Sequence, residues 1–281
     1  MTKENKKILI TSMGRSGSTW LADLINHKKK FNEVFEPFFP GNVPEAKPFG
    51  YYRFLESSNK NTEFPKLASL LMSGKIRNKW LDSGVVESGN KKILVKDIRT
   101  NLMLDWIKHN FPQLKIILLI RDPFEVANSW VRLNWKKIPL SDDYDIDVIL
   151  KQRQLLKSFP EIAGLVGDYK NNTHFESVIL EWCILNYVPL IQHTMNPDLC
   201  HIVSYNQLLG HPKRELKKVF NFIGEEFDEN VLGKINSKSR TTFAGVNQVY
   251  HPSEAENNKS LSIIKSFNLE HYIAASKNIH R

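Results

Sequence analysis

The segment whose residue types and spacing point most clearly to a chemical role is Gly14–Trp20, which reads Gly-Arg-Ser-Gly-Ser-Thr-Trp. It follows the apolar run Lys7–Thr11 and precedes residues with helical apolar spacing. Glycines let backbone N–H groups approach an anion, a helix N-terminus adds the positive end of its dipole, and hydroxyl groups add donors. The stretch therefore predicts a phosphate-binding loop, with an ordinary capped turn between strand and helix as the alternative.

The loop departs from the Walker A pattern of nucleotide hydrolases. That pattern ends in Gly-Lys followed by Ser or Thr, which together serve the phosphates and the magnesium ion. Here Gly17 is followed directly by Ser18, and the basic residue, Arg15, stands two places before the glycine. The spacing disfavours a magnesium-nucleotide hydrolase.

A second candidate site follows the apolar run Lys115–Ile120. Arg121 comes directly after that run, Pro123 is suited to the start of a helix, and Ser129 lies eight residues after Arg121. Parallel sheets bind ligands at the carboxyl ends of their strands, where an arginine can hold a phosphate bidentately and a serine can add a donor. The segment predicts a second phosphate contact. The alternative is a strand-end arginine and an ordinary helical serine.

Together the two segments resemble sulfotransferases that use 3′-phosphoadenosine 5′-phosphosulfate (PAPS), with carbohydrate-type and bacterial relatives closest. In that family a basic-Ser-Gly-x-Thr-Trp loop holds the 5′-phosphosulfate, and an Arg and a Ser eight residues apart hold the 3′-phosphate. Arg15–Trp20 matches the first pattern, and Arg121 with Ser129 matches the second. Ser204–Pro212 is similar to the family's Tyr-Glu-Asp-Leu stretch, so the resemblance spans residues 7 to about 243.

The resemblance implies a donor site built from residues far apart in the chain. Trp20 would stack on the adenine, Tyr205 would lie against the same base, and residues 239–241 would form a late loop that closes on the nucleotide. The implied donor-binding residues are Arg15, Ser16, Gly17, Ser18, Thr19, Trp20, Arg121, Ser129, Tyr205, Ser239, Arg240 and Thr241. The Arg-Lys-Gly signature of the animal cytosolic enzymes is absent from the sequence.

Sulfuryl transfer needs a cation that stabilises charge growing on the leaving oxygen, and a base that takes the acceptor's proton. Arg15 fits the first role, and because arginine keeps its proton we expect charge stabilisation only. The cytosolic relatives place a histidine base two residues after a lysine that corresponds to Lys96. Ile98 stands at that place here, so the base must come from elsewhere.

Carbohydrate-type relatives have a Glu about twenty residues after the basic residue of the loop, and Glu36 lies twenty-one residues after Arg15. Glu36 is therefore the implied catalytic base. The aromatic and proline residues of Phe35–Phe39 predict an apolar setting that raises the pKa of this carboxyl group, which suits a general base. One alternative is a solvated loop glutamate. Asp97 and Arg99 are further candidates for contacts at the reacting end, or else form a strand-end ion pair.

Four continuous apolar runs predict strands that are covered on both faces; they are Lys7–Thr11, Lys92–Lys96, Lys115–Ile120 and His201–Tyr205. Each run is followed by apolar residues at the spacing of an amphipathic helix. The last of these helices should start at Pro212 and stop at Gly224. The alternation predicts an α/β fold with a parallel sheet flanked by helices. The resemblance implies the P-loop-like, three-layer arrangement of sulfotransferases and nucleotide kinases.

We expect a single sulfotransferase domain over residues 1–281, because neither an internal repeat nor a separating linker is visible in the sequence. Two irregular excursions, at about 38–90 and 134–172, interrupt the strand–helix rhythm and carry helical pieces near 67–72 and 146–157. Long insertions between core elements commonly build binding surfaces. These excursions should therefore select the acceptor.

The composition is that of an ordinary globular protein, with 281 residues, 41% hydrophobic and 25% charged, which excludes collagen, coiled-coil rods and disordered tails. Its two cysteines, Cys183 and Cys200, exclude a disulfide framework and favour a reducing compartment.

No run approaches the ~20 apolar residues of a membrane span and no signal peptide is visible, so we expect a cytoplasmic protein. Because Cys-x-x-Cys and His-x-x-His pairs are absent from the sequence, we expect no metal site.

The sequence thus predicts an enzyme that moves a sulfuryl group from PAPS to an acceptor hydroxyl by in-line displacement and releases adenosine 3′,5′-bisphosphate. The context of Glu36 favours a sugar or glycoconjugate acceptor. Two alternatives stay open: a nucleotide kinase-like phosphotransferase, and a non-catalytic protein that binds nucleic acid or another polyanion, which the net charge of +9 would suit. Recognised nucleic-acid-binding motifs are missing from the sequence, so we expect no nucleic-acid partner.

Overall fold

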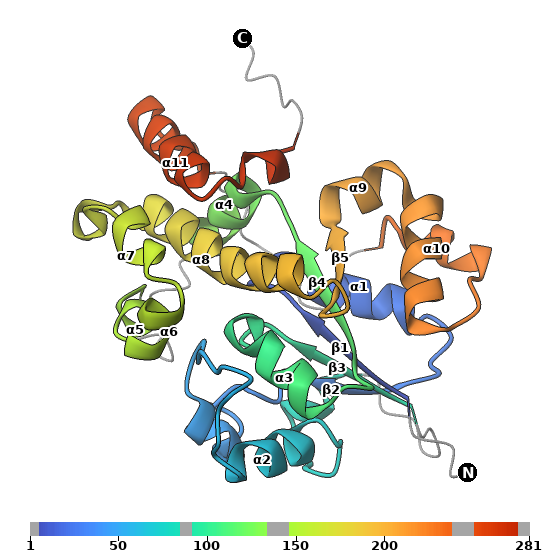
Figure 1. Ribbon diagram of the computed structural model, residues 1–281. Helices are drawn as coiled ribbons and strands as arrows, with labels where there is room; N and C mark the ends of the chain where they lie inside the picture. Colours follow the sequence, from blue (N-terminus) through green and yellow to red (C-terminus); the bar gives the residue numbers. More distant parts are fainter. Residues whose placement is uncertain (1–5, 85–91, 134–145, 238–249, 275–281) are drawn as a thin grey trace.

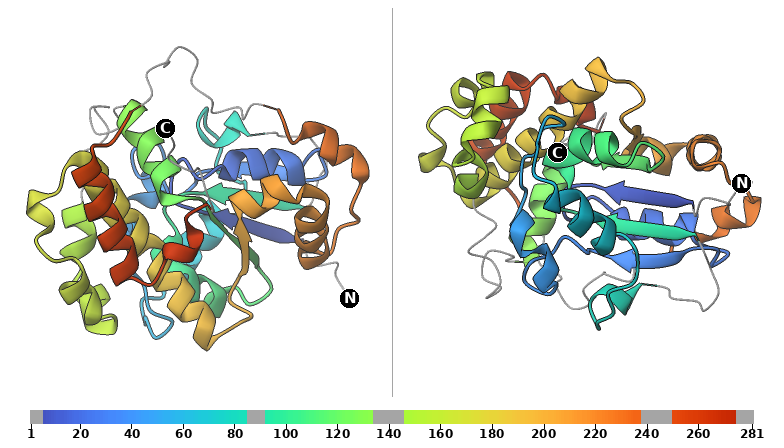
Figure 2. Two further views of the ribbon diagram at one scale, coloured as in Figure 1. Left: turned by 90° about the horizontal axis from the view of Figure 1, so that it is seen from above. Right: turned by 60° about the horizontal axis from the view of Figure 1, so that its bottom comes forward.

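The computed structural model describes residues 6–84, 92–133, 146–237 and 250–274. They contain a five-stranded parallel sheet, in the spatial order β2-β3-β1-β4-β5 (Figures 1 and 2). The strands are β1 (Lys7–Thr11), β2 (Asn32–Phe35), β3 (Ile93–Asp97), β4 (Lys115–Ile120) and β5 (His201–Ser204). Because β1 pairs with β3 on one side and β4 on the other, the segments that follow these three strands emerge at the same edge of the sheet.

The predicted strands are confirmed, with β1 and β4 at the predicted bounds and β3 and β5 within one residue of them. The sequence pattern missed β2, whose residues read Asn-Glu-Val-Phe. Only half of this short segment is apolar, so it gives no continuous hydrophobic run. It forms the edge of the sheet, and its last residue, Phe35, is paired in register with Lys96.

Helices cover both faces of the sheet (Figure 1). Ile8 and Ile10 pack in one apolar cluster with α1 (Ser18–Ile25), α9 (Tyr205–Gly210) and α10 (Pro212–Ile223). Leu9, between them in sequence, packs in the other cluster with α3 (Leu104–Asn110) and α8 (His174–Met195). Since alternate residues of a strand point to opposite faces, this division confirms the predicted three-layer α/β architecture.

The long helix α8 forms much of the second layer. It begins with a capping box between Thr173 and Glu176, is buried along most of its length, and packs against α4 (Pro123–Leu133) and α11 (Glu254–Ser266). The sequence pattern did not predict α8, because a helix that is buried on most of its sides shows no amphipathic stripe. Across the described parts of the chain, no helix has both the length and the apolar character needed to cross a membrane.

The first excursion contains η1 (Pro44–Phe49), α2 (Glu63–Leu71) and η2 (Leu81–Ser83) as far as it is described. The helical piece predicted near residues 67–72 falls in α2. The ring of Phe49 packs against the rings of Phe38, Phe64 and Trp106, with centroids 5.1, 5.1 and 6.1 Å away. These aromatic contacts attach the excursion to α3 and to the apolar cluster that also contains Leu9 of β1.

The continuous helix predicted over residues 146–157 is wrong, because the chain forms two helices there, α5 (Ile146–Leu150) and α6 (Arg153–Ser158). Gln152 lies between them and extends to the first excursion. Its side-chain oxygen accepts from the Phe54 N–H at 2.8 Å, and its amide nitrogen donates to the Tyr52 carbonyl at 2.9 Å. The two excursions are therefore joined by hydrogen bonds. The remaining short helices are α7 (Glu161–Leu165), η3 (Asn101–Met103), η5 (Tyr169–Asn171), η6 (Glu229–Lys234) and η7 (Glu270–Tyr272).

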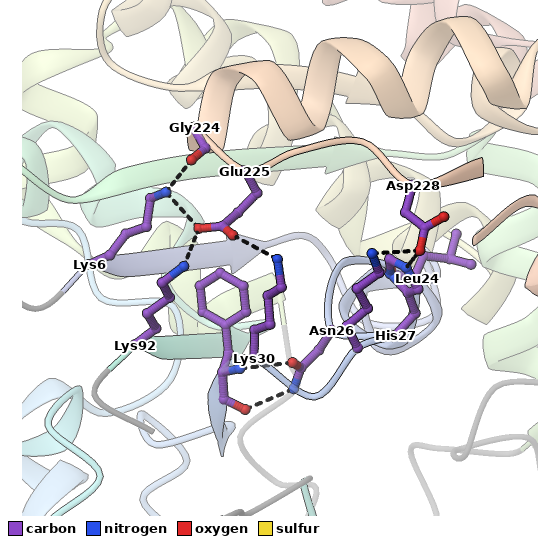
Figure 3. Close-up of polar contacts among 11 residues, drawn as sticks. Lys6, Leu24, Asn26, His27, Lys30, Lys92, Gly224, Glu225 and Asp228 are labelled. Carbon is purple, nitrogen blue, oxygen red and sulfur yellow. Dashed lines mark hydrogen bonds and ion pairs between the residues drawn. The ribbon is translucent and has the colours of Figure 1, made fainter. Parts of the chain in front are cut away.

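At the amino ends of the strands, lysines gather around Glu225, which follows α10 (Figure 3). Lys6 and Lys92 each place Nζ 2.7 Å from one carboxylate oxygen, and Lys30 lies 3.8 Å from the other. Burial opposes ionisation of Glu225, but the hydrogen bonds and charges of Lys6 and Lys92 outweigh it and lower the pKa of the carboxyl group. This cluster ties the end of α10 to the starts of β1 and β3.

Glu225→Gln should lower the free energy of unfolding by on the order of 1 kcal/mol at neutral pH, the upper range for a partly exposed ion pair. Because the pKa is lower in the folded chain, the carboxylate stabilises the protein above its ordinary pKa of 4.5, and this contribution is lost as the pH falls. Urea unfolding of both proteins at several pH values should show a difference that is constant above the ordinary pKa of 4.5 and shrinks as the pH falls below it. Glu63→Gln, which alters an exposed pair with Lys66, is the control. A difference that does not change with pH would contradict this account.

Candidate active site

The loop between β1 and α1 has backbone geometry suited to an anion. Arg15 and Gly17 adopt left-handed conformations, with φ of 69° and 96°. Gly17 occupies the N-cap position of α1 and has no side chain to cap the first helical N–H groups, so these can serve an external acceptor. The indole Nε1 of Trp130 donates to the Gly14 carbonyl at 3.0 Å, which fastens the loop to α4. Ser16, Ser18 and Thr19 are buried within the same loop.

Arg121 lies at the carboxyl end of β4, where α4 begins at Pro123 as predicted. Its Nη1 donates to the Arg15 carbonyl at 3.2 Å, so the second segment directly contacts the first. Its Nε donates to Glu125 at 2.8 Å, and its guanidinium carbon lies 4.6 Å from the centre of the Tyr205 ring. The turn is supported from α8 by Trp182, whose Nε1 donates to the Arg121 carbonyl at 3.0 Å.

Ser129 joins the two segments from the other side. Arg15 Nε donates to Ser129 Oγ at 3.0 Å, across 114 residues of sequence. Burial lowers the pKa of the Arg15 guanidinium to about 10, and the charges of Arg121 and Arg132 act in the same direction. Arg15 remains protonated at neutral pH. Arg15 and Arg121 are in contact at the loop, and the charge of Arg132 also acts on Arg15, so the local field favours a polyanion.

Tyr205 and Trp20 lie together beside the loop, with ring centroids 5.1 Å apart. Trp20 is only 5% exposed, and its Nε1 donates to the Ile235 carbonyl at 3.2 Å. Tyr205 is more accessible and passes so close to the loop that a Cβ at position 17 would lie 2.7 Å from its ring. The structure thus places Trp20 largely in the core, with Tyr205 as its outer neighbour.

Glu36 follows β2 in a left-handed conformation, φ 45°, at the same edge of the sheet. It is 5% exposed and binds two cations: Lys96 Nζ lies 2.5 Å from Oε1, and Arg99 Nη1 lies 2.8 Å from Oε2. The predicted rise in its pKa is wrong. Burial does act to raise it, but the charges of Lys96 and Arg99 outweigh burial and lower the pKa below its ordinary value of 4.5. The alternative of a solvated loop glutamate is also wrong.

Asp97 is fully buried behind this cluster and serves the backbone. Its two carboxylate oxygens accept from the N–H groups of Phe38 at 2.8 Å and Arg99 at 2.7 Å. Burial raises the pKa of Asp97 to about 6, with Glu36 acting in the same direction and Arg99 opposing. Arg99 itself pairs with Glu36, and its guanidinium carbon lies 4.0 Å from the centre of the Phe39 ring. Asp97 thus shapes the turn that holds Arg99 in place.

The structure adds residues that the sequence pattern did not single out. Glu125 lies four residues after Arg121, a spacing that permits an ion pair on a helix, and could have been found from that signal. Lys96 pairs with Glu36, a role that the sequence pattern does not predict. The predicted contacts from Ser239, Arg240 and Thr241 lie outside the described residues. Within the described segments, clusters of three or more His, Cys, Asp or Glu residues that could hold a metal ion are absent.

Comparison with known families decides the class of the protein. The family model for the sulfotransferase domain matches residues 5–266. The chain belongs to the sulfotransferase family. This membership identifies it as an enzyme, and the predicted family is confirmed. A search of the curated proteins found no match.

Solved structures show that this sulfotransferase shares the P-loop-like fold of its family. The sulfotransferase domain of the curacin biosynthetic pathway is 16% identical, with a TM-score of 0.51 over 94% of this chain and 98% of that one. The sulfotransferase domain of the Synechococcus PCC 7002 olefin synthase is 17% identical, with a TM-score of 0.53 over 96% of each chain. Mouse sulfotransferase SULT7A1, complexed with PAP, is 12% identical, with a TM-score of 0.50 over 95% and 89%.

Gly17→Ala should disturb the loop of this sulfotransferase for two reasons. The residue needs φ of 96°, and the new Cβ would collide with the Tyr205 ring at 2.7 Å. We expect a loss of about 1–3 kcal/mol in the free energy of unfolding, the usual cost of backbone strain. Gly164→Ala in α7 is the matched control, because its Cβ meets nothing within 4 Å; it should stabilise by about 0.5–1 kcal/mol. Urea unfolding measures both, and two variants of equal stability would contradict the contact with Tyr205.

Proposed function

We propose that this sulfotransferase takes its sulfuryl group from PAPS and transfers it to a hydroxyl of a sugar or glycoconjugate. The observation that carries the proposal is the contact between the two anion-type segments, Arg15 Nε to Ser129 Oγ at 3.0 Å and Arg121 Nη1 to the Arg15 carbonyl at 3.2 Å. A donor with phosphate groups on both the 5′ and 3′ positions needs two anion sites a few ångströms apart. The loop supplies the first, and Arg121 with Ser129 supplies the second.

The residues present fit this donor in charge and shape. The uncapped N–H groups of α1 and the Arg15 guanidinium suit the 5′-phosphosulfate, since helix N-termini and arginines both favour anions. Tyr205 offers an accessible ring for the adenine, and Trp20 supports it from the core. We propose that residues 239–241 add donor contacts, as the family resemblance implies.

In the transfer step the acceptor oxygen attacks sulfur in line with the leaving phosphate oxygen. The new O–S bond forms as the bond from sulfur to the phosphate oxygen breaks, and adenosine 3′,5′-bisphosphate leaves. Arg15 stabilises the charge that grows on the leaving oxygen. We assign the acceptor's proton to Glu36. Because the hydroxyl becomes strongly acidic as the O–S bond forms, a carboxylate of low pKa can accept its proton.

In this proposal the first excursion, at about residues 38–90, selects the acceptor. Its residues Phe39, Tyr51 and Trp80 form an aromatic group close to Glu36: the Phe39 ring lies 5.9 Å from Tyr51 and 5.1 Å from Trp80, and Trp80 Nε1 donates to the Glu36 carbonyl at 3.3 Å. Phe39 and Tyr51 are buried, and Trp80, which is half-buried, offers the ring of this group that suits the apolar face of a sugar. Incubation with a radiolabelled-sulfate donor and panels of sugars, phenols, lipids and steroids tests this class, and exclusive labelling of a non-sugar would overturn it.

We also propose that the chain acts as one domain in the cytoplasm. The two cysteines, Cys183 and Cys200, are both free and buried in the same apolar cluster, which suits a reducing compartment. Fractionation of the source cells tests the compartment, and limited proteolysis tests the domain. Release of two stable fragments would contradict a single domain.

The donor assignment predicts that adenosine 3′,5′-bisphosphate binds far better than AMP. Each charge-assisted hydrogen bond to the 3′-phosphate contributes on the order of 1.5–3 kcal/mol when desolvated. Arg121→Ala should remove most of this preference and Ser129→Ala a smaller part, while Arg214→Ala, an exposed pair with Glu215 on α10, should leave it intact. Calorimetric titration of both nucleotides measures the ratio. Equal affinities for the two nucleotides in the unaltered protein would remove the donor assignment.

The base assignment predicts that Glu36→Gln lowers kcat by about 10²–10⁴, the range for a lost general base, with little change in nucleotide affinity. Glu63→Gln, an exposed glutamate in the same excursion, should keep normal kcat. A near-normal kcat for Glu36→Gln would place the base elsewhere and leave the donor assignment unaffected.

The dependence of kcat/KM on pH distinguishes Glu36 from Asp97 as the catalytic base. A base works only when deprotonated, so activity is lost as the pH falls through its pKa. With Glu36 as base, kcat/KM should stay flat between pH ~7 and ~5 and fall only below the ordinary carboxyl value of 4.5. With Asp97 as base, kcat/KM should instead begin to fall near its pKa of about 6. Steady-state kinetics across this range decides between them.

A further inference from the structure

The guanidinium group of Arg121 is held from several directions at once. Of its five N–H bonds, the one on Nε points to Glu125 Oε2 at 2.8 Å, and Nη2 lies 2.8 Å from the same oxygen. Nη1 donates to the Arg15 carbonyl at 3.2 Å. One face of the group is covered by the Tyr205 ring, 4.6 Å from the guanidinium carbon. Among the described residues, at least one N–H on each terminal nitrogen is therefore left for a ligand.

N–H groups on the two terminal nitrogens of an arginine form a fork that can pair with two oxygens of one phosphate. Bidentate pairing of this kind adds geometric specificity as well as binding energy. A flexible arginine loses that benefit unless its orientation is fixed before the ligand arrives. The contacts to Glu125 and to the Arg15 carbonyl supply this fixation.

Glu125 is itself placed by the start of α4. It lies in the first turn of the helix, four residues after Arg121, and its own N–H donates to Asp122 Oδ1 at 3.0 Å. Asp122 is further held by the Ala274 N–H, which donates to Oδ2 at 2.7 Å. The Arg121 and Glu125 side chains are 25% and 28% exposed, so the pair lies at the surface of the site and can be reached by a ligand.

We infer that Glu125 is a positioning residue for the donor: it orients the Arg121 fork toward the 3′-phosphate. The inference rests on the proposed PAPS donor. A carboxylate beside a phosphate also repels it, so the two possible effects of Glu125 have opposite signs. Orientation dominates because the carboxylate is already neutralised by Arg121, and because the positive field at the loop comes additionally from Arg15 and Arg132.

The test compares Glu125→Ala and Glu125→Gln by calorimetry with adenosine 3′,5′-bisphosphate and with AMP. Glu125→Ala should weaken binding of the bisphosphate about tenfold, as is found when partners that orient metal ligands are removed, and leave AMP unchanged. Glu125→Gln keeps an oxygen that can accept from Nε and Nη2, so it should stay within about threefold of the unaltered protein. Glu215→Ala, which removes a first-turn acid from α10, is the matched control for helix stability. Urea unfolding verifies that each variant is folded.

The outcomes separate the inference from the function on which it rests. If both Glu125 variants bind the bisphosphate more tightly, repulsion dominates and the inference is wrong. If Glu125→Ala leaves the affinity for the bisphosphate unchanged, Glu125 has only a structural role and the inference is again wrong. In the background of Arg121→Ala, removal of Glu125 should have no further effect, and a further loss would overturn the inference. Equal binding of the two nucleotides by the unaltered protein would instead remove the proposed donor.

Discussion

The parallel pairing of β1 with β4 is the constraint on which the site depends. Adjacent parallel strands deliver their carboxyl ends to the same edge, so the loop after β1 and the turn after β4 become neighbours although more than a hundred residues separate them. The hydrogen bonds from Arg15 to Ser129 and from Arg121 to the Arg15 carbonyl follow from this pairing. The indoles of Trp130 and Trp182 then fix the two segments to α4 and α8. A change that shifted the register of β1 and β4 would separate both anion contacts at once.

Charge is organised at this edge by pairing carboxylates with arginines. Glu36 is held between Lys96 and Arg99, and Glu125 lies against Arg121, so each acid fixes the direction of a cation. The buried pairs of Glu36 contribute little net stability, because desolvation of the charges offsets their attraction, and the partly exposed pair of Glu125 also contributes little. Their value lies in orientation. These ion pairs at the carboxyl ends of the strands therefore fix geometry and add little to the stability of the fold. The two apolar clusters on the faces of the sheet supply that stability.

Much of the fold could be predicted because its central strands are continuous apolar runs and its helices start and stop at clear signals. Pro123 and Pro212 open α4 and α10, and Gly224, with φ of 62°, ends α10. The short edge strand β2 and the largely buried helix α8 were not predicted, because β2 lacks a continuous apolar run and α8 lacks an amphipathic stripe. The pKa of Glu36 was predicted in the wrong direction for a physical reason. Local sequence shows the aromatic neighbours that desolvate the carboxyl group, but Lys96 and Arg99 reach it only through the pairing of β2 with β3.

The central position of β1 also affects how the chain is made. Synthesis delivers β1 well before its partners β3 and β4, which begin only at Ile93 and Lys115. Until β3 has left the ribosome, the apolar segment Ile8–Ile10 has neither partner strand to pair with, and an unpaired apolar strand favours aggregation. Long-range parallel pairing is also slow to form. The topology that brings the two anion contacts together thus leaves β1 unpaired during synthesis until β3 emerges, so this segment would gain from shielding by a chaperone.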